Sequence, residues 1–370
     1  MSEPPAELYI GLMSGTSQDA IDGVLAEFDA TGKSHRLLAA HSLPLAECLR
    51  QRLDRLQFGG GDLELAITLH HELGEQFACC ALQLLADAGE NPVKAIGSHG
   101  QTVRHDPNGA APYSLQLGNA AWIAARCRVA VVADFRNGDI AVGGQGAPLA
   151  PAFHQAAFGE AGTQRAVLNL GGMANVSLLD SDGATVRGWD TGPGNVLLDG
   201  WAQRHLGRPY DDDGNFARRG RVHEALLDAL LAHPFITRPP PKSTGRETFN
   251  LASVDALLAR FAPLPAADVQ ATLAEFTAAS VAVNLQTHRS VQQLLVCGGG
   301  VRNGDLMARI ARHLPWLTVS STADAGVAPQ HVEALAFAWL ARQRMHKQAL
   351  DLRAVTGAHR PAILGCVYLP

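Results

Sequence analysis

The sequence lacks the features that mark secreted, membrane-spanning or nucleic-acid-binding proteins. Its six cysteines have no CxxC spacing and most lie in apolar segments, so we expect reduced core thiols in a cytoplasmic protein rather than a metal site. The formal net charge is −5, and dispersed Lys and Arg give no attraction to nucleic acid or to an anionic membrane. No apolar run approaches the roughly 20 residues that span a bilayer. Residues 1–7 are acidic and contain proline, so no secretory signal is expected.

Two common catalytic motifs are missing as well. No Lys follows Gly15 in the first glycine-rich turn, which excludes the GxxxxGK[ST] pattern of a P-loop. Glu75 stands where an HExxH zinc helix beginning at His71 would need its second His. A nucleotide would therefore have to bind through another arrangement.

Two similar glycine-rich turns, one in each half of the chain, are the most informative feature present. The first follows the apolar residues 8–13 and contains Gly15, and the second follows residues 167–170 and contains Gly171 and Gly172. Each pattern is typical of a strand, a tight turn and a returning strand, in which backbone N–H groups can bind phosphate oxygens. A single turn of this kind is equally compatible with an ordinary hairpin. The matched pair predicts two lobes that close on a nucleotide.

The order of predicted elements also occurs twice, which predicts a duplicated α/β fold with mixed sheets and a central cleft between two lobes. A chain of 370 residues exceeds the size at which one hydrophobic core stops growing. In each half, three strands precede alternating helices and strands. The first half has strands at 8–13, 21–28, 35–43, 93–98 and 129–133 and helices at 63–88 and 119–126. The second half has strands at 166–170, 174–179, 185–189, 294–297 and 317–320 and helices at 196–205, 267–288, 303–313 and 332–345.

The expected first lobe spans residues 1–135, and a C-terminal segment of about 350–370 returns to it. Residues 136–349 form the expected second lobe, with a hinge just before or within the Gly- and Pro-rich residues 138–151. The stretch 234–249 contains three consecutive prolines, so neither a helix nor a central strand is expected there. Residues 356–370 are expected to form a final turn and strand.

The chain contains six glycine-rich or polar runs that belong together: residues 11–22 (GLMSGTSQDAID), 98–105 (SHGQTVRH), 168–175 (LNLGGMAN), 188–195 (GWDTGPGN), 242–247 (KSTGRE) and 297–301 (CGGGV). Together these runs resemble the anhydro-N-acetylmuramic acid kinase family. The resemblance begins with Gly11–Asp22 and departs from the family only slightly there, because Gln18 and Ala20 stand where Leu and Gly are usual. The motifs follow in order from residue 9 nearly to the C-terminus, which makes the resemblance highly specific. It implies the two-lobed fold of sugar kinases, actin and Hsp70 chaperones.

The resemblance implies an unusual reaction. Water opens the 1,6-anhydro ring of anhydro-N-acetylmuramic acid while the γ-phosphoryl group of ATP passes to O6, giving N-acetylmuramic acid 6-phosphate and ADP. The reaction belongs to cell-wall peptidoglycan recycling and amino-sugar catabolism. ATP, Mg²⁺ and the anhydro sugar are the implied ligands. A homodimer is one possible oligomeric state. A hydrolase of the exopolyphosphatase type and a different carbohydrate kinase are the alternatives, and the order of motifs favours the family above.

Asp190 is the expected general base for the attacking water, because it ends a strand and precedes a tight turn into a helix. The alternative is that Asp190 caps the helix that begins near Val196. Glu333 begins the last long helix, where it either orients catalytic groups or caps that helix.

The nucleotide residues are carried over from the resemblance. The first turn is expected to bind the β- and γ-phosphates, and Asp19 and Asp22 either hold Mg²⁺ or cap the turn. Gly298 to Gly300 resemble the adenosine segment, although a plain strand-to-helix turn also fits. The expected contacts are Gly15, Thr16, Ser17, Gln18, Asp19, Ala20, Ile21, Asp22, Gly171, Gly172, Asn175, Gly298, Gly299 and Gly300.

The sugar carries a lactyl carboxylate, so at least one cation is expected near it. An Arg offers a fork that matches a carboxylate, and we favour Arg136 because it ends a first-lobe strand near the hinge. A solvated surface position is the commoner role for any one of these cations, and His99 could be merely structural. The expected sugar contacts are His99, Gln101, Arg136 and Thr191, and the other candidate cations are Arg104, Lys242 and Arg246.

Overall fold

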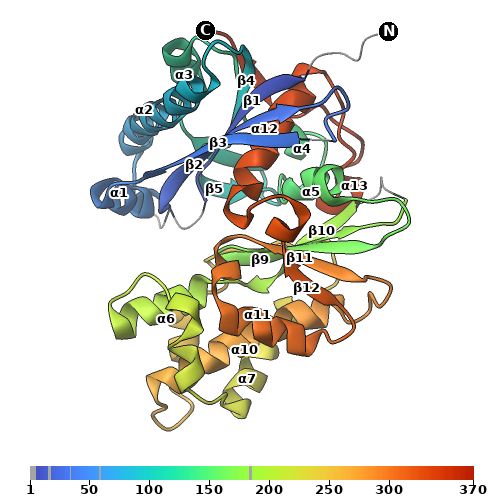
Figure 1. The fold of residues 1–370 in the computed structure, drawn as a ribbon. Helices are drawn as coiled ribbons and strands as arrows, with labels where there is room; N and C mark the ends of the chain where they lie inside the picture. The colour runs from blue at the N-terminus through green and yellow to red at the C-terminus, as the bar shows by residue number, and fades with distance from the viewer. Residues whose placement is uncertain (1–5, 16–17, 34, 58–59, 183–185) are drawn as a thin grey trace. The chain divides into compact units, whose positions relative to one another are not determined.

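The computed structural model describes residues 6–15, 18–33, 35–57, 60–182 and 186–370 and divides the chain into two compact units (Figure 1). Unit 1 contains Met1–Ala157 and His331–Pro370, and unit 2 contains Phe158–Gln330. These limits differ from the expected ones at 135/136 and about 350. One reason is α5 (Ala150–Phe158), whose buried Phe153 packs 6.1 Å from the ring of Trp339 in unit 1.

Unit 1 is built on a six-stranded sheet in the order β13-β7-β4-β1-β2-β3. Three N-terminal strands form an antiparallel meander, and β4 and β7 join it in parallel. The last strand, β13, pairs antiparallel with β7, so the C-terminal segment belongs to unit 1. The strands are β1 (Glu7–Met13), β2 (Ala20–Phe28), β3 (His35–Pro44), β4 (Val93–Ser98), β7 (Val131–Ala133) and β13 (Cys366–Tyr368).

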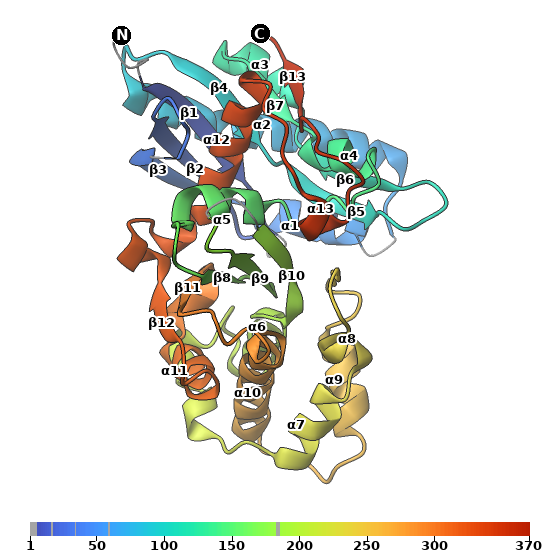
Figure 2. The same cartoon turned by 90° about the vertical axis from the view of Figure 1, so that its right-hand side faces the viewer.

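Two long helices cover opposite faces of this sheet, α2 (Leu63–Ala88) and α12 (Val332–Met345) (Figure 2). Gly11 lets α12 approach closely, because a Cβ there would lie 1.9 Å from the carbonyl oxygen of Ala334. Gly23 does the same for α2, since its Cβ would lie 2.7 Å from the Sγ of Cys80. Any larger side chain at Gly11 would push α12 off the sheet.

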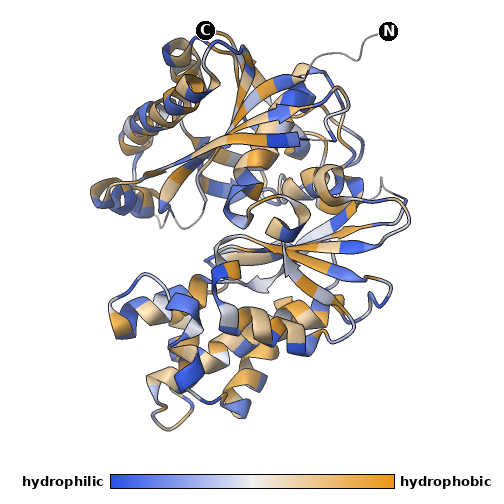
Figure 3. Ribbon diagram, in the orientation of Figure 1, coloured by the Kyte–Doolittle hydropathy of each residue, from blue (hydrophilic) through white to orange (hydrophobic). Residues whose placement is uncertain are grey.

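Several unit 1 elements were not predicted from the sequence. Helix α1 is amphipathic, with Leu49, Leu53 and Leu56 buried among polar residues, and it is mostly hydrophilic in Figure 3. A separate hairpin of β5 and β6 follows β4. Helix α3 (Ala120–Cys127) agrees with the helix expected at 119–126. The elements that were not expected are α1 (Glu47–Gln57), β5 (Gln101–Asp106), β6 (Tyr113–Leu117), α4 (Phe135–Ile140) and α13 (Arg353–Thr356).

Unit 2 has a five-stranded sheet in the order β10-β9-β8-β11-β12. Its first three strands are antiparallel neighbours, and β11 and β12 follow in parallel. Unit 1 has the same arrangement in β3-β2-β1-β4-β7, so the expected duplicated α/β fold is confirmed. The strands are β8 (Arg165–Leu170), β9 (Met173–Leu179), β10 (Val186–Pro193), β11 (Gln293–Cys297) and β12 (Thr318–Ser321).

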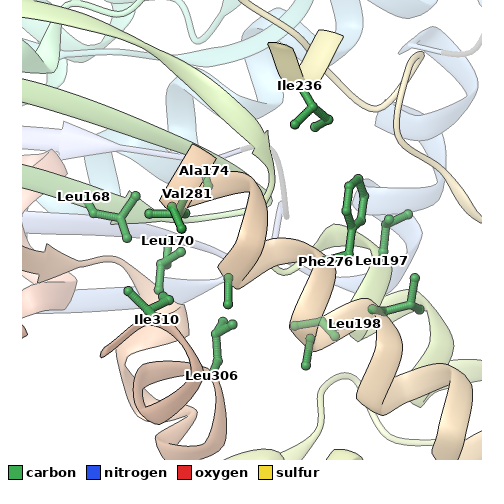
Figure 4. Close-up of a cluster of buried hydrophobic side chains, with 14 of the residues drawn as sticks. Leu168, Leu170, Ala174, Leu197, Leu198, Ile236, Phe276, Val281, Leu306 and Ile310 are labelled. Atoms are coloured by element: carbon green, nitrogen blue, oxygen red, sulfur yellow. The ribbon is translucent and has the colours of Figure 1, made fainter. Parts of the chain in front are cut away.

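The core of unit 2 lies between this sheet and its helices. Figure 4 shows Leu168 and Leu170 of β8 near Val281, Leu306 and Ile310. Residues 234–237 form a short helix, although no helix was expected between residues 234 and 249. The helix is possible because Pro234 occupies the first helical position, where a proline is well accommodated. The helices are α6 (Val196–Leu206), α7 (Glu224–Leu231), α8 (Pro234–Thr237), α9 (Leu251–Leu258), α10 (Ala266–Leu285) and α11 (Gly304–His313).

Two expectations about composition can be compared with the structure. Among the described residues, no helix combines the length and apolar character needed to cross a bilayer. All six cysteines are free thiols, as expected. Only three of them lie in the core, because Cys48, Cys79 and Cys366 are exposed.

Candidate active site

The first glycine-rich turn joins β1 to β2 in unit 1. The Ser14 hydroxyl donates to Gln101 Oε1 at 2.7 Å, and Gln101 Nε2 donates to the Gly15 carbonyl oxygen at 3.3 Å. Gln101 is fully buried, so its amide supports the turn rather than facing outward to a sugar. Thr16 and Ser17, which the sequence assigns to the phosphates, lie outside the described residues.

Gln18 anchors the turn to α1. Its backbone has a φ of 58°, and its side chain is 2% exposed. Its Nε2 donates to Gln57 Oε1 at 2.9 Å and to Asp54 Oδ1 at 3.3 Å. Gln18 thus forms a polar link between the turn and α1.

The two acidic residues of this segment both carry accessible carboxylates. Asp19 Oδ1 lies 3.7 Å from Arg50 Nη1, and Asp22 Oδ1 accepts a 2.7 Å hydrogen bond from Ser42. No group of three or more metal-binding side chains occurs in the described residues. Two carboxylates nevertheless suit Mg²⁺, which usually completes its shell with phosphate oxygens and water. Ala20 and Ile21 begin β2, and the Ile21 side chain lies in the core.

His99 and Arg136 form a direct pair in unit 1. Arg136 approaches His99 Nε2 with Nε at 3.1 Å and Nη2 at 2.9 Å. Burial and the adjacent Arg136 charge hold the pKa of His99 well below its usual range, so the ring is neutral and Nε2 accepts. The structure therefore brings together two of the residues that the sequence assigns to the sugar.

A buried carboxylate that the sequence analysis missed orders the loop beside Arg136. Asp139 Oδ2 accepts from the Gly146 N–H at 2.7 Å, and its Oδ1 accepts from the Thr356 hydroxyl at 2.8 Å. The Gly146 carbonyl in turn accepts from Arg136 Nη1 at 2.8 Å. Burial raises the pKa of Asp139. The sequence offered one signal for this role, because Asp139 is an acidic residue within the Gly- and Pro-rich stretch 138–151.

Glu333 lies in the first turn of α12 and is partly buried. A carboxylate at this position interacts favourably with the positive end of the helix dipole. Its placement agrees with either of the roles considered from the sequence.

In unit 2 the register aligns four residues across neighbouring strands. Asn175 of β9 lies opposite Asn169 of β8 on one side and Asp190 of β10 on the other. Cys297 of β11 lies opposite Asn169. Side chains that are directly opposed share one face of a sheet. The predicted phosphate residue Asn175 and the predicted base Asp190 are therefore cross-strand neighbours.

A β-bulge follows Asp190. The register shifts between Asp190 and Gly192, so Thr191 is the extra residue, and bulges commonly re-aim a side chain beside a functional site. Thr191 is fully buried and its hydroxyl donates to the Ala174 carbonyl at 3.2 Å. This placement differs from the expected sugar contact, because the hydroxyl faces the protein interior.

The loop of residues 242–248 holds Asp190 by its main chain. The Asp190 N–H donates to the Lys242 carbonyl at 3.1 Å, and Asp190 Oδ2 accepts from the Thr244 N–H at 2.8 Å. The alternative role for Asp190 is wrong, because the N-cap of α6 is Asn195. The sequence analysis missed Thr244, although the matching run 242–247 contains it.

The second glycine-rich turn joins β8 to β9 and packs against the start of α6. The Gly172 carbonyl accepts from the Gly194 N–H at 2.9 Å, and the Gly171 carbonyl accepts from the Asn195 N–H at 2.8 Å. Gly194 is required by this close approach, because a Cβ there would lie 2.3 Å from the Gly171 oxygen.

The triple glycine lies beside the same turn. A Cβ at Gly298, whose φ is 81°, would lie 2.4 Å from Asn169 Oδ1, and one at Gly300 would lie 2.6 Å from Leu170 Cβ. Nothing lies within 4 Å of the corresponding position at Gly299. The segment leads through a 3₁₀ turn, Gly299–Arg302, into α11. Unit 2 thus gathers its predicted nucleotide residues at the ends of β8 and β11.

The candidate cations differ in what they bind. Arg104 donates to the Gln57 carbonyl, and the buried Lys242 donates to the carbonyls of Phe235 and Ile236, both at 3.0 Å. Burial lowers the pKa of Lys242 to about 8, although Asp190 opposes this shift. Arg246 Nε is buried and lacks a hydrogen-bond acceptor among the described residues.

The chain is similar to known proteins over nearly its whole length. The model of the anhydro-N-acetylmuramic acid kinase family matches residues 7–370. The anhydro-N-acetylmuramic acid kinase of Xanthomonas axonopodis pv. citri (strain 306) is 49% identical, with 100% of both chains covered. That of Burkholderia lata is 48% identical, covering 99% of this chain and 97% of the relative. Among solved structures, the activator of the 2-hydroxyisocaproyl-CoA dehydratase from Clostridium difficile is 14% identical with a TM-score of 0.48, covering 92% of this chain and 96% of that chain.

The family match spans nearly the whole chain, and the relatives have nearly the same length. The chain therefore belongs to the anhydro-N-acetylmuramic acid kinase family.

Proposed function

We propose that the chain performs the family's reaction with Asp190 as the general base that activates the attacking water. The kinase activity on anhydro-N-acetylmuramic acid follows from family membership over the full chain. The observation that supports the role of Asp190 is its place at a β-bulge, with main-chain groups of Lys242 and Thr244 holding it from one loop. A carboxylate fixed in this way needs little reorganisation to accept a proton.

In the proposed reaction, the water oxygen bonds to the anomeric carbon and its proton passes to Asp190. The bond between the anomeric carbon and O6 breaks, and O6 attacks the γ-phosphorus of ATP, which releases ADP. An inverting glycosidase uses a carboxylate base in the same way. Here phosphoryl transfer to the departing oxygen replaces the usual protonation by a general acid.

For the nucleotide, each unit supplies its own set of residues. Gly171, Gly172, Asn175 and the triple glycine of unit 2 are proposed to contact ATP, supported by their common location at the ends of β8 and β11. In unit 1 the proposed contacts are Gly15, Thr16, Ser17, Gln18, Asp19, Ala20, Ile21 and Asp22.

Asp19 and Asp22 are proposed to hold Mg²⁺, which offsets phosphate charge in such transfers. Their oxygen donors and accessible positions fit this role. His99 and Arg136 are proposed as sugar contacts, with Gln101 supporting the first turn and Glu333 orienting reacting groups. For Thr191 the supported contribution is the bulge that it forms beside Asp190.

We also propose that the protein acts in the cytoplasm. ATP is available there, and cysteine thiols such as the six free ones of this chain stay reduced. A homodimer remains a prediction that sedimentation equilibrium tests.

Replacing Asp190 by Asn tests the assignment of the base. General base catalysis is worth about 10²- to 10⁴-fold, so we expect Asp190→Asn to lose at least that much turnover while it still binds ATP and the anhydro sugar. Steady-state ADP release measures turnover, and calorimetry measures binding. Asp180→Asn, which lies at the far end of the β9–β10 hairpin near Arg187, is the matched control and should keep turnover within about twofold. Near-normal turnover of Asp190→Asn would show that another group activates the water.

The same assay distinguishes the alternative carbohydrate kinase. The chain is incubated with Mg-ATP and anhydro-N-acetylmuramic acid, N-acetylmuramic acid or N-acetylglucosamine in turn. ATP consumption should be strong only with the anhydro sugar. Strong consumption only with an ordinary hexose would refute the proposed substrate.

A further inference from the structure

Residues 242–248, which we call the Asp190 loop, carry two polar groups that nothing in the described protein satisfies. Thr244 Oγ1 and Arg246 Nε are both buried and lack a hydrogen-bond partner among the described residues. Buried polar groups in folded proteins nearly always have a partner, so each exception calls for an explanation. Such atoms occur elsewhere in the described chain too, Ser98 Oγ and His99 Nδ1 among them, but the pair in this loop lies next to the proposed base, where a ligand can supply the missing partners.

The position of the loop defines where such a ligand would lie. Thr244 donates its N–H to Asp190 Oδ2 at 2.8 Å, so the Thr244 hydroxyl belongs to a residue already in contact with the proposed base. The Lys242 carbonyl accepts from the Asp190 N–H at 3.1 Å, which fixes the loop at a second point. A ligand on Thr244 and Arg246 would therefore lie close to the proposed base, Asp190.

The charge of the loop indicates the sign of that ligand. Arg246 supplies a guanidinium, the loop also carries the exposed carboxylate of Glu247, and Lys242 already donates to the carbonyls of Phe235 and Ile236. Arg136 and Arg104 likewise donate to protein acceptors, Gly146 and Gln57 respectively. Among the candidate cations, Arg246 is thus the one with a buried donor still to be satisfied.

We propose that Thr244 and Arg246 form an anion subsite that binds the lactyl carboxylate of the substrate. The inference rests on the proposed function, because only the muramic sugar carries this group. A guanidinium matches a carboxylate in geometry, and the Thr244 hydroxyl adds a neutral donor. The positive charge of Arg246 also offsets repulsion between the substrate carboxylate and Asp190. The γ-phosphate of ATP is the other anion with the same chemistry, and the test separates the two.

The test measures preference between two sugars. One is anhydro-N-acetylmuramic acid, and the other is 1,6-anhydro-N-acetylglucosamine, which lacks the lactyl group. For each variant we compare two preference ratios. The first is kcat/KM for the muramic sugar divided by kcat/KM for 1,6-anhydro-N-acetylglucosamine, and the second is the Kd of 1,6-anhydro-N-acetylglucosamine divided by the Kd of the muramic sugar, both Kd values from calorimetry. Charged hydrogen bonds of this kind correspond to about 10- to 100-fold, so Arg246→Met should reduce both ratios by that factor. Thr244→Val removes a neutral donor and should reduce them by about two- to tenfold.

Arg238→Met is the matched control, since it removes an exposed Arg from the segment leading to Lys242. It should keep both ratios within about twofold. If Arg246→Met does not fold, Arg246→Lys keeps the charge without the fork and should reduce the ratios by a smaller factor. Circular dichroism and thermal unfolding verify that each variant is folded.

Other outcomes would overturn the subsite. Unchanged ratios in Arg246→Met would exclude it, and so would a raised KM for ATP with unchanged sugar ratios, which would assign the loop to phosphate. A collapse of the ratios in Arg136→Met but not in Arg246→Met would move the carboxylate to Arg136. A wild-type chain that turns over neither sugar would refute the proposed function. In that case the Kd ratios alone would test the anion subsite. Failure of the wild-type chain to bind either sugar would refute both the proposed function and the anion subsite.

Discussion

Lys242 is an ionisable side chain in an unusual setting. It is 3% exposed, its ammonium binds two carbonyls at the end of α8, and its own carbonyl binds Asp190. Burial lowers its pKa to about 8. The residue therefore links a short helix to the proposed base, and its charge changes within an accessible pH range.

This setting predicts a loss of activity at alkaline pH. Lys242 is protonated below about pH 8 and neutral above it, so kcat/KM should fall as the pH rises through that value, because the attraction to Asp190 and the hydrogen bonds to the carbonyls weaken. Arg stays charged, so Lys242→Arg should move the fall to higher pH. A pH–rate profile from pH 6.5 to 10 measures both. An identical alkaline limb in Lys242→Arg would assign the titration to another group.

For single residues of the candidate site, the sequence predicted which residues matter better than it predicted which atoms they contact. Asp190 and Asn175 were singled out, and the register places them opposite each other. The burial of Thr191 was not predictable, because it follows from a one-residue bulge that no local pattern marks. Asp139 and Thr244 were missed for a related reason: in each case a main-chain N–H, that of Gly146 or of Thr244 itself, donates to a carboxylate, and only the folded loop places that N–H.

Helices α10 and α11 are joined by a compact network of charges. Arg309 Nη1 lies 2.6 Å from Glu275 Oε2, and Arg309 Nε lies 2.7 Å from Asp305 Oδ2. His313 Nε2 approaches Glu275 Oε1 at 2.6 Å. Burial raises the pKa of Glu275, but the hydrogen bonds from Arg309 and His313 outweigh it, so the pKa lies below its usual value. The network is fully formed only when Glu275 is ionised.

Glu275→Gln should therefore destabilise unit 2 in a pH-dependent way. A charged hydrogen bond in a buried setting contributes about 2 kcal/mol, which corresponds to roughly 4–8 °C in Tm for a unit of this size. The contribution of Glu275 is complete above the unfolded pKa, near 4.5, and is lost as the pH falls through the lower folded pKa. Thermal unfolding should show the full difference at pH 7 and a much smaller one at pH 3. The exposed Glu90→Gln is the control, and an equal loss at both pH values would contradict the role of the charge.

Regular elements were largely predictable because their hydrophobic periodicity is strong. The strands of both sheets and the long helices α2, α10 and α12 agree with the patterns read from the sequence. The amphipathic α1 and the β5–β6 hairpin were missed because their buried residues are few and separated by polar ones. The assignment of α12 to unit 1 depends on close packing at Gly11, which periodicity alone does not reveal.

On the scale of the whole molecule, unit 1 is assembled from two separate stretches of chain. Its C-terminal part supplies α12 on one face of the sheet and β13 at one edge. Leu364 is buried just before β13, and a Cβ at Gly365 would lie 2.7 Å from Val132. The last residues are therefore part of the core of unit 1.

Deleting residues 358–370 should weaken unit 1 selectively. The deletion uncovers the backbone groups of β7 that pair with β13, so amide hydrogen exchange at Val131–Ala133 should become faster. Exchange in β8 of unit 2 should stay as in the full chain. Unchanged protection of β7 would show that β13 contributes little to this edge.

The interrupted sequence of unit 1 has a consequence for synthesis on the ribosome. Residues 158–330 are contiguous and form unit 2, whereas β1 and β4 cannot meet α12 until residues 332–345 have been made. At about 5–20 residues per second, the apolar face of the first sheet waits on the order of 10 to 40 s for its cover. During that interval the second half of the chain can complete its own core first, so the part translated earlier is the part finished last.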